Sequence, residues 1–280
     1  MRFLVLDAYP REGREALRGA GGTDAGSLYA RMLRRILPDA GVDVAYPADP
    51  DPRLEDGATL ADYAGAVWTG SSLTILDAAD ARVRRQIALA RALYRARVPS
   101  FGSCWAAQLA VVAAGGSCAA SPKGREIGVA RGIALSAEGR AHPLFEGKPV
   151  RFDAFASHAD EIATLPAGAR LLASNDFSRV QAVDVSHEGG RFWALQYHPE
   201  YDLSEIAALC RLRRDELVDQ GTFDDADAVD RYVGRLDALH GDPARGDLVR
   251  ELALGDDVLD EAVRTREVRN WIGHQVLPAR

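Results

Sequence analysis

Cysteine is scarce in this 280-residue chain, and its scarcity argues against a disulfide framework. Cys104, Cys118 and Cys210 form a sparse, odd-numbered set, which is typical of proteins from a reducing compartment. Long hydrophobic runs are missing too, because none approaches the roughly 20 residues that a membrane helix needs. The first apolar run, Phe3 to Leu6, meets Asp7 at once and is too short for a signal-peptide core. We therefore expect a cytoplasmic protein without a membrane partner.

An excess of positive charge is also absent. The formal net charge is −7, so nothing suggests nucleic acid or an anionic membrane as the partner. No Gly-x-x-x-x-Gly-Lys-Ser/Thr phosphate loop occurs, and no pyrophosphatase-type loop that would bring an ATP-using synthetase half. The remaining histidines do not form a cluster with metal-ligand spacing; they are His142, His187, His240 and His274. We expect neither a metal nor an organic cofactor.

Short apolar runs alternate with helical patterns in the first part of the chain. Helical spacing of apolar residues marks 28–37 and 81–97, whereas the polar, glycine-rich stretch 11–26 predicts a loop. The alternation predicts an α/β fold with a mostly parallel central sheet flanked by helices. Sites in such folds lie beyond the C-terminal ends of the strands. The runs that predict buried strands are 3–6, 42–46, 66–69 and 98–101.

The pattern changes after residue 116, where short strand-like runs follow one another between turns. This half is predicted to be β-rich, with antiparallel pairs that extend the sheet. Helical patterns return at residue 203, and one of them spans 258–272. We predict a domain over 1–217 and a C-terminal helical extension over 218–280. The strand-like runs are 127–135, 151–155, 171–174, 180–185 and 192–197.

Cys104 lies on a turn of small residues within Gly102–Gln108, between the predicted strand and a helix over 105–114. A cysteine at a helix N-terminus is favoured as the thiolate by the helix dipole and the free N–H groups. The alternative is that Cys104 is a buried small hydrophobe, which is the common fate of a free cysteine. We interpret Cys118 and Cys210 as structural.

A histidine and an acid follow another apolar run, in Gln196–Glu200. On an extended chain, residues two apart point the same way, so Glu200 is expected to orient His198. Together with Cys104 these residues supply a nucleophile, a base and an orienting acid, which is the logic of a catalytic triad.

The two segments together resemble the class I, or triad-type, glutamine amidotransferase family, whose pattern is Gly-x-Cys-x-Gly-x-Gln and later Gln-x-His-Pro-Glu. Residues Ser157–Glu161 look like the Ser-His-Gly-Asp segment of GMP synthase-like amidotransferase domains. The resemblance covers about residues 1–217. This sequence departs from the family pattern at Ala106 and Ala159, which replace glycines, and in lacking the proline of the common Gly-Gly-Pro loop. A methyl group is tolerated there if φ is negative.

The resemblance implies roles for individual residues. Cys104 is the nucleophile, His198 the base and Glu200 its orienting partner. Backbone N–H groups that hold the oxyanion are implied at Gly70, Ser71 and Trp105. Substrate-binding residues are implied at Gln108, Ser157, His158 and Ala159.

Three functions are compatible with these residues. In the first, the γ-amide of glutamine is cleaved through a Cys104 thioester, and ammonia passes to a separate synthetase subunit. In the second, the chain is a stand-alone γ-glutamyl hydrolase or peptidase. In the third, it is a catalytically idle regulatory or binding module. The expected partners are glutamine or another γ-glutamyl compound, and a synthetase or a second copy of the chain. The extension over 218–280 is expected to be a cap on the domain, a lid over the Cys104 pocket or a subunit contact.

Overall fold

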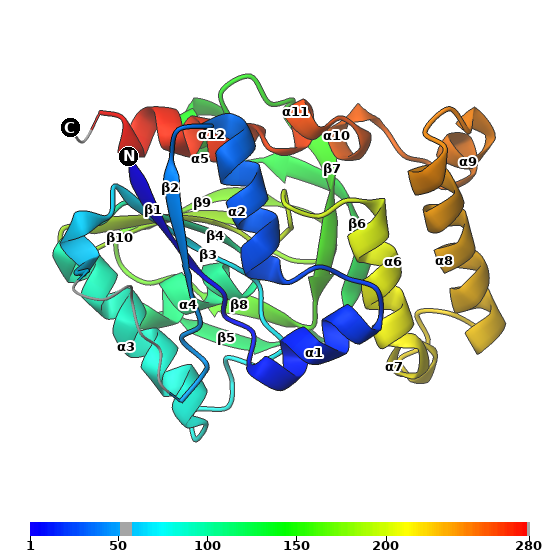
Figure 1. Ribbon diagram of the computed structural model, residues 1–280, viewed down its shortest axis with the longest axis horizontal. Coiled ribbons are helices and arrows are strands. Elements are labelled where there is room, and N and C mark those ends of the chain that lie inside the picture. The colour runs from blue at the N-terminus through cyan, green and yellow to red at the C-terminus, as the bar shows by residue number, and fades with distance from the viewer. Residues whose placement is uncertain (51–57, 279–280) are drawn as a thin grey trace.

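Strands from both halves of the chain build the centre of the molecule, seen in the computed structural model, which describes residues 1–50 and 58–278 (Figure 1). They are β1 (Arg2–Leu6), β2 (Gly41–Ala45), β3 (Gly65–Trp68), β4 (Ser100–Ser103), β5 (Ser117–Ala120), β6 (Glu126–Leu135), β7 (Arg151–His158), β8 (Asp160–Thr164), β9 (Ala169–Ser174), β10 (Ala182–His187) and β11 (Gly190–Leu195). Nine of them form one sheet in the order β2-β1-β3-β4-β11-β10-β9-β6-β7, while β5 and β8 pair separately.

The nine-stranded sheet has a parallel and an antiparallel part. Strands β2, β1, β3, β4 and β11 run parallel to their neighbours. From β11 onward β10, β9, β6 and β7 are antiparallel. The predicted fold class is confirmed, as is the antiparallel extension from the second half of the chain. The C-terminal ends of β3 and β4 meet at one edge of the parallel part, where sites of α/β proteins lie.

Helices flank the sheet. They are α1 (Arg11–Gly19), α2 (Ala25–Ile36), α3 (Ala81–Ala96), α4 (Trp105–Ala113), α5 (Ala137–Ala141), α6 (Leu203–Leu212), α7 (Arg214–Asp219), α8 (Ala226–Gly241), α9 (Gly246–Glu251), α10 (Asp256–Leu259), α11 (Glu261–Arg264) and α12 (Arg266–Trp271). Alternation along β1 decides which face each side chain serves. Leu4 and Leu6 pack in the core under α3 and α4, whereas Phe3 and Val5 pack with α2 and α12.

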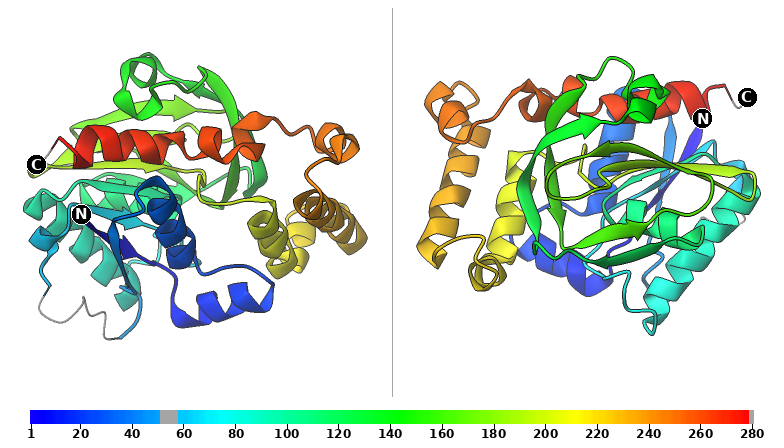
Figure 2. Two further views of the ribbon diagram at one scale, coloured as in Figure 1. Left: turned by 45° about the horizontal axis from the view of Figure 1, so that its top comes forward. Right: turned by 180° about the vertical axis from the view of Figure 1, so that it is seen from behind.

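The C-terminal segment packs back on the rest of the chain. Helix α8 contributes Val229 and Leu236 to a third core with Leu17 and Phe155. Helix α12 brings Trp271 to the sheet, with its ring centroid 5.9 Å from that of Phe3. Figure 1 shows α10 to α12 running along the top of the molecule back toward the N-terminus, and both views of Figure 2 show the same course.

Two expectations from the sequence are wrong. The stretch 11–26 contains helix α1 and the start of α2 rather than a loop. The helix expected over 258–272 is broken into α10, α11 and α12. The break has a physical cause, because the Asp260 side chain accepts a hydrogen bond from the Ala262 N–H and begins a new helix there.

Candidate active site

Cys104 lies on the sharp turn between β4 and α4. Its φ is 54° and its ψ is −102°, an unusual conformation for a residue other than glycine. Its N–H still donates to Leu195 O at 2.7 Å, which continues the pairing with β11. The strained turn therefore presents the thiol at the N-terminus of α4, as the sequence predicts.

The turn is possible only because its neighbour is small. A Cβ at Gly102 would lie 2.4 Å from Ala106 Cβ and 2.5 Å from Trp68 O, both far inside van der Waals contact. Gly102 thus allows α4 to leave the sheet at a steep angle. The same crowding accounts for the alanine at 106, which touches the strand.

His198 and Glu200 face each other beside this turn. His198 Nδ1 lies 2.7 Å from Glu200 Oε1, and both side chains are buried. The Ser103 hydroxyl donates to the same Oε1 at 2.8 Å. The expected contact is present, although the assumed extended backbone is not, because Pro199 and Glu200 form a turn after β11.

Both the histidine and the cysteine pack around Gly70. A Cβ at Gly70 would lie 2.9 Å from His198 Cε1 and 3.8 Å from Cys104 Cβ. Tyr201 covers the other side of the imidazole, with ring centroids 3.9 Å apart and planes 8° from parallel. Within the described residues, His198 Nε2 has no hydrogen-bond partner. The ring is thus fixed on both faces, with Nε2 left free for proton transfer.

Electrostatics favours a protonated His198. Burial alone would lower the pKa of His198, but the Glu200 charge outweighs it, and hydrogen bonding with Cys104 and Glu200 raises it further, to about 9. Burial has the opposite consequence for the other thiols, since it raises the pKa of Cys118 and of Cys210 to about 12. Of the three cysteines, only Cys104 has an imidazolium beside it.

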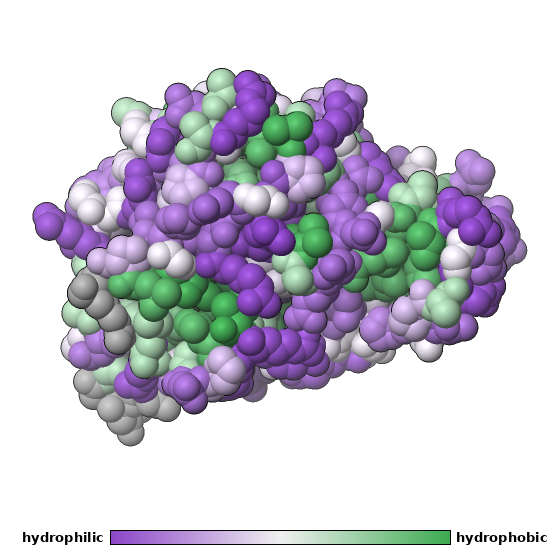
Figure 3. All heavy atoms as spheres, turned by 90° about the horizontal axis from the view of Figure 1, so that it is seen from above, coloured by the Kyte–Doolittle hydropathy of each residue, from purple (hydrophilic) through white to green (hydrophobic). Residues whose placement is uncertain are grey.

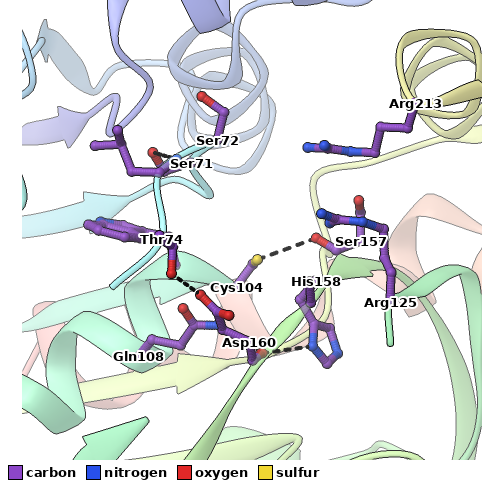
Figure 4. Close-up of a pocket in the computed structure, with 13 residues that line it drawn as sticks. Ser71, Ser72, Thr74, Cys104, Gln108, Arg125, Ser157, His158, Asp160 and Arg213 are labelled. Atoms are coloured by element: carbon purple, nitrogen blue, oxygen red, sulfur yellow. Dashed lines mark hydrogen bonds between the residues drawn. The ribbon is translucent and has the colours of Figure 1, made fainter. Parts of the chain in front are cut away.

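A cavity of about 170 Å³ opens over Cys104. Figure 4 shows the thiol in its middle, with Ser71 and Ser72 on one side and two arginines, Arg125 and Arg213, on the other. Among the expected site residues, its lining includes Ser71, Cys104, Trp105, Gln108, Ser157, His158 and Ala159. Gly70, His198 and Glu200 lie in the layer directly behind these.

The floor of the cavity is polar. Gln108 Nε2 donates to Asp160 O at 3.0 Å, and the Asp160 carboxylate accepts from the Thr74 hydroxyl at 2.6 Å. The Cys104 thiol lies 3.6 Å from Ser157 O. The structure therefore brings the expected Gln108 and Ser157 to the nucleophile, and it adds Thr74 and Asp160 (Figure 4).

His158 is anchored away from the thiol. Its Nε2 lies 2.8 Å from Glu126 Oε2, and its Nδ1 lies 3.1 Å from Asp160 O. Glu126 also accepts hydrogen bonds from Gln181 and Asn175. The imidazole thus shapes the turn between β7 and β8 while its edge lines the cavity.

The backbone around Cys104 offers N–H groups for a developing oxyanion. Trp105 begins α4, so its N–H has no acceptor within the helix. Gly70 and Ser71 follow β3, the strand beside β4. The replaced glycines do not disturb this region, because Ala106 and Ala159 are not among the described residues with positive φ.

Sequence reasoning misses several residues of the site. Tyr201 follows Glu200 directly, and Ser72 follows Ser71, so adjacency to a motif is a usable signal. Arg125 and Arg213 come from segments far from either motif and carry no local pattern. Among the described residues, no group of three or more His, Cys, Asp or Glu side chains is arranged to hold a metal.

A family model describes two thirds of the chain. The model named "Glutamine amidotransferase class-I" matches residues 23–210. Across the described residues, no helix has the length and apolarity needed to span a bilayer.

Curated relatives of two kinds are found. A γ-glutamyl-L-1-hydroxyisopropylamide hydrolase from Pseudomonas sp. is 30% identical over 99% of this chain and 94% of its own length. The glutamine-hydrolysing subunit of GMP synthase from Methanocaldococcus jannaschii is 28% identical over 63% of this chain and 85% of its own length. A glutamine-hydrolysing GMP synthase from Nitratiruptor sp. is matched over only 33% of its length, at 29% identity.

Solved structures share the fold over nearly the whole chain. A glutamine amidotransferase from Thermotoga maritima superposes with a TM-score of 0.69 at 16% identity, covering 99% of this chain and 98% of that one. Another, from Methylobacillus flagellatus, gives a TM-score of 0.65 at 19% identity, covering 97% and 93%.

Proposed function

Because the chain belongs to the class I glutamine amidotransferase family, we propose that it is a cysteine-dependent hydrolase that cleaves the γ-amide bond of a γ-glutamyl compound. The observation that carries the proposal is the arrangement of Cys104, His198 and Glu200 under a cavity of about 170 Å³. A cavity of this size fits an amino acid rather than the drug-sized ligands of sites of roughly 300–1,000 Å³.

The first half of the reaction forms a thioester. The Cys104 thiolate attacks the γ-carbonyl carbon, and the imidazolium of His198 keeps the thiol proton at Nε2. Backbone N–H groups of Trp105 and of Gly70 or Ser71 hold the oxyanion, each worth about 3 kcal/mol of barrier. His198 then protonates the leaving amine as the C–N bond breaks.

The second half releases glutamate. Water attacks the thioester carbon and gives its proton to His198 Nε2, and the C–S bond breaks to restore the thiolate. Glu200 keeps the imidazole oriented throughout and stabilises its positive charge, as the acid of a triad does. Gln108, Ser157 and the segment 158–160 hold the amino-acid end of the substrate.

Stand-alone hydrolysis of a substituted γ-glutamyl amide is the version we favour. Its support is the relative that acts on a γ-glutamyl hydroxyisopropylamide, which matches this chain through the C-terminal helices as well as the shared domain. The GMP synthase relatives favour a second candidate, in which glutamine is cleaved and ammonia passes to a separate synthetase. The three free cysteines favour a cytoplasmic location for either.

Glutamate release from purified full-length protein tests the proposal. We expect turnover of γ-glutamyl alkylamides without any partner, and loss of at least about 1,000-fold in Cys104→Ser because the alcohol is a weaker nucleophile. A glutamine-analogue electrophile should label Cys104 alone, with Cys118→Ser as the matched control.

Label found on Cys118 or Cys210 would overturn the nucleophile assignment. Turnover of glutamine alone, accelerated by an added synthetase, would favour the second candidate. Absence of turnover with every γ-glutamyl compound would leave the idle binding module.

A further inference from the structure

Two arginines enter the candidate active-site cavity from segments outside the family motifs. Arg125 precedes β6, and Arg213 lies between α6 and α7. Their side chains are 12% and 17% exposed, and both guanidinium groups point into the cavity (Figure 4). Groups so largely removed from water interact strongly with any charge that enters.

The pair shares a single carboxylate. Arg125 Nη2 lies 2.9 Å from Glu216 Oε1, and Arg213 Nη1 lies 3.2 Å from Glu216 Oε2. The flanking arginines are different, because Arg211 pairs with Asp237 and Arg214 with Asp230. Within the described part of the chain, the cluster at the cavity therefore retains one uncompensated positive charge.

Arg213 also keeps hydrogen-bond donors in reserve. Its Nε is buried and has no partner within the described residues. A guanidinium with its planar set of donors suits a carboxylate better than any other common side chain does. An incoming carboxylate would satisfy the spare donor and the spare charge together.

The cavity places these arginines apart from Asp160, the acid in its lining. Asp160 is held by Thr74 beside Gln108, on the floor of the cavity. A carboxylate there suits the α-ammonium group of a glutamyl substrate. The glutamyl chain and the leaving amine extend in opposite directions from the γ-carbonyl carbon at Cys104. The arginines therefore belong to the amine side.

The amine side also has room. A second hollow of about 510 Å³ shares Ser72 and Arg213 with the cavity over Cys104. Its other walls include Tyr9 and Gly13, and a larger group at Gly13 is excluded because a Cβ there would lie 2.5 Å from Ser72 Oγ. An amine portion larger than ammonia thus has space beyond Arg213.

We propose that Arg213 and Arg125 bind a carboxylate on the amine portion of the substrate, so that the preferred substrates are γ-glutamyl peptides, in which the γ-carboxyl is joined to an amino acid. This inference rests on the proposed hydrolysis and specifies its substrate class. Amines that carry a positive charge are disfavoured by the same residual charge.

Four γ-glutamyl amides of similar size test it with the full-length protein. They carry glycine, ethanolamine, ethylamine and ethylenediamine as the amine, and so present a negative, a hydroxyl, an apolar and a positive end. We expect kcat/KM to be about ten-fold or more higher for γ-glutamylglycine than for the ethylamide, and lowest for the ethylenediamine compound.

Arg213→Gln should remove this preference. Its kcat/KM for γ-glutamylglycine should fall about ten-fold further than its kcat/KM for the ethylamide or for glutamine. Arg231→Gln, an equal charge change on the exposed face of α8, is the matched control and should leave the ranking intact. Binding of γ-glutamylglycine to the Cys104→Ser protein should weaken in parallel.

Equal losses on all substrates, glutamine included, would mean that the arginines bind the α-carboxylate of the glutamyl group or only support the fold, and would overturn the inference. A wild-type preference for the ethylamide or the cationic amide would overturn it too. Both results leave Cys104-dependent glutamate release intact, so they are distinct from failure of the proposed function, in which no compound releases glutamate.

Discussion

The charge on His198 sets the pH range in which the site can work. Its pKa of about 9 is the balance of burial, which lowers it, against the larger combined effect of Glu200 and Cys104. The reactive state holds one proton between the thiol and the imidazole. When that proton is lost, no acid remains for the leaving amine.

We therefore predict that kcat/KM falls above about pH 9, and that Glu200→Gln moves this fall toward lower pH by about one unit or more. The sign follows because the carboxylate raises the pKa of His198, so its removal lowers that pKa. A rate profile from about pH 6 to 10.5 measures the shift. Glu251→Gln, an exposed change on α9, is the control, and an identical fall in Glu200→Gln and wild type would contradict the prediction.

Ser103 is a positioning residue for the acid. Its hydroxyl donates to Glu200 Oε1, the same atom that faces His198 Nδ1. Losing one buried hydrogen bond costs about 1–2 kcal/mol, so Ser103→Ala should lower kcat by about five- to thirty-fold. Ser100→Ala on the same strand is the matched control, because Ser100 donates only to Val98 O.

A double variant separates positioning from a general loss of stability. Residues that act as one unit give strongly non-additive effects. Ser103→Ala should therefore cost little once Glu200 is already glutamine. If the two losses multiply, Ser103 does not act through Glu200.

The turn after β3 is the element that keeps His198 in place. Gly70 leaves no room for a methyl group, because a Cβ would lie 2.9 Å from His198 Cε1. Gly70→Ala should push the imidazole from the thiol and lower kcat by about 100-fold, in line with the cost of a small misplacement of a reacting group. The midpoint of thermal unfolding should change by only a few degrees.

Gly234→Ala on α8 provides the comparison. A Cβ there meets nothing within 4 Å, and glycine inside a helix costs about 0.5–1 kcal/mol relative to alanine. This variant should be slightly more stable and fully active. Unchanged turnover in Gly70→Ala would show that the histidine is not confined by this turn.

Local patterns predict most elements but miss those governed by distant contacts. Helix α1 escapes prediction because Leu17 is its one buried apolar residue of large size. Arg14, which is also buried, is held by Tyr9 O and Asp49 rather than by any pattern within the helix. The elbow at Cys104 is predictable because small residues and a strand-to-helix boundary are local features.

The same limit applies to the site. Cys104 and His198 lie in motifs that a reader of the sequence can find, whereas Arg125 and Arg213 reach the cavity only through the course of the sheet and of α6. Glu126 supports His158 because β6 pairs with β7. Residues brought together by topology leave no spacing signal in the chain.

The C-terminal helices complete the molecule as a whole. Trp271 fills a position against Phe3 and Phe101. Glu267, fully buried, accepts from Tyr197, the residue before His198, and pairs with Lys148 at 3.0 Å. Figure 3 shows hydrophobic surface at the α8 end of the molecule, where Leu203, Leu239 and Val258 line a hollow between α6, α8 and α10. Of the roles expected for the extension, these contacts favour a cap.

Replacement of Trp271 by alanine is the milder test of the cap. Trp271→Ala in the full chain should lower the free energy of unfolding by about 3–5 kcal/mol, measured by denaturant titration. Its kcat at temperatures below its own unfolding transition should stay near that of the wild type, because Trp271 does not line the cavity. A stability equal to that of the wild type would show that the indole does not hold the extension to the sheet.

Truncation after Gln220 is the more severe test and should abolish soluble expression. The shortened chain would expose the face of the sheet that Trp271 covers. It would also leave Lys148 buried without its carboxylate, a defect that costs several kcal/mol. A truncated protein that remains soluble and hydrolyses substrate at the wild-type rate would contradict the cap. If that soluble, active protein also changed its oligomeric state, the segment would instead be a contact between copies of the chain.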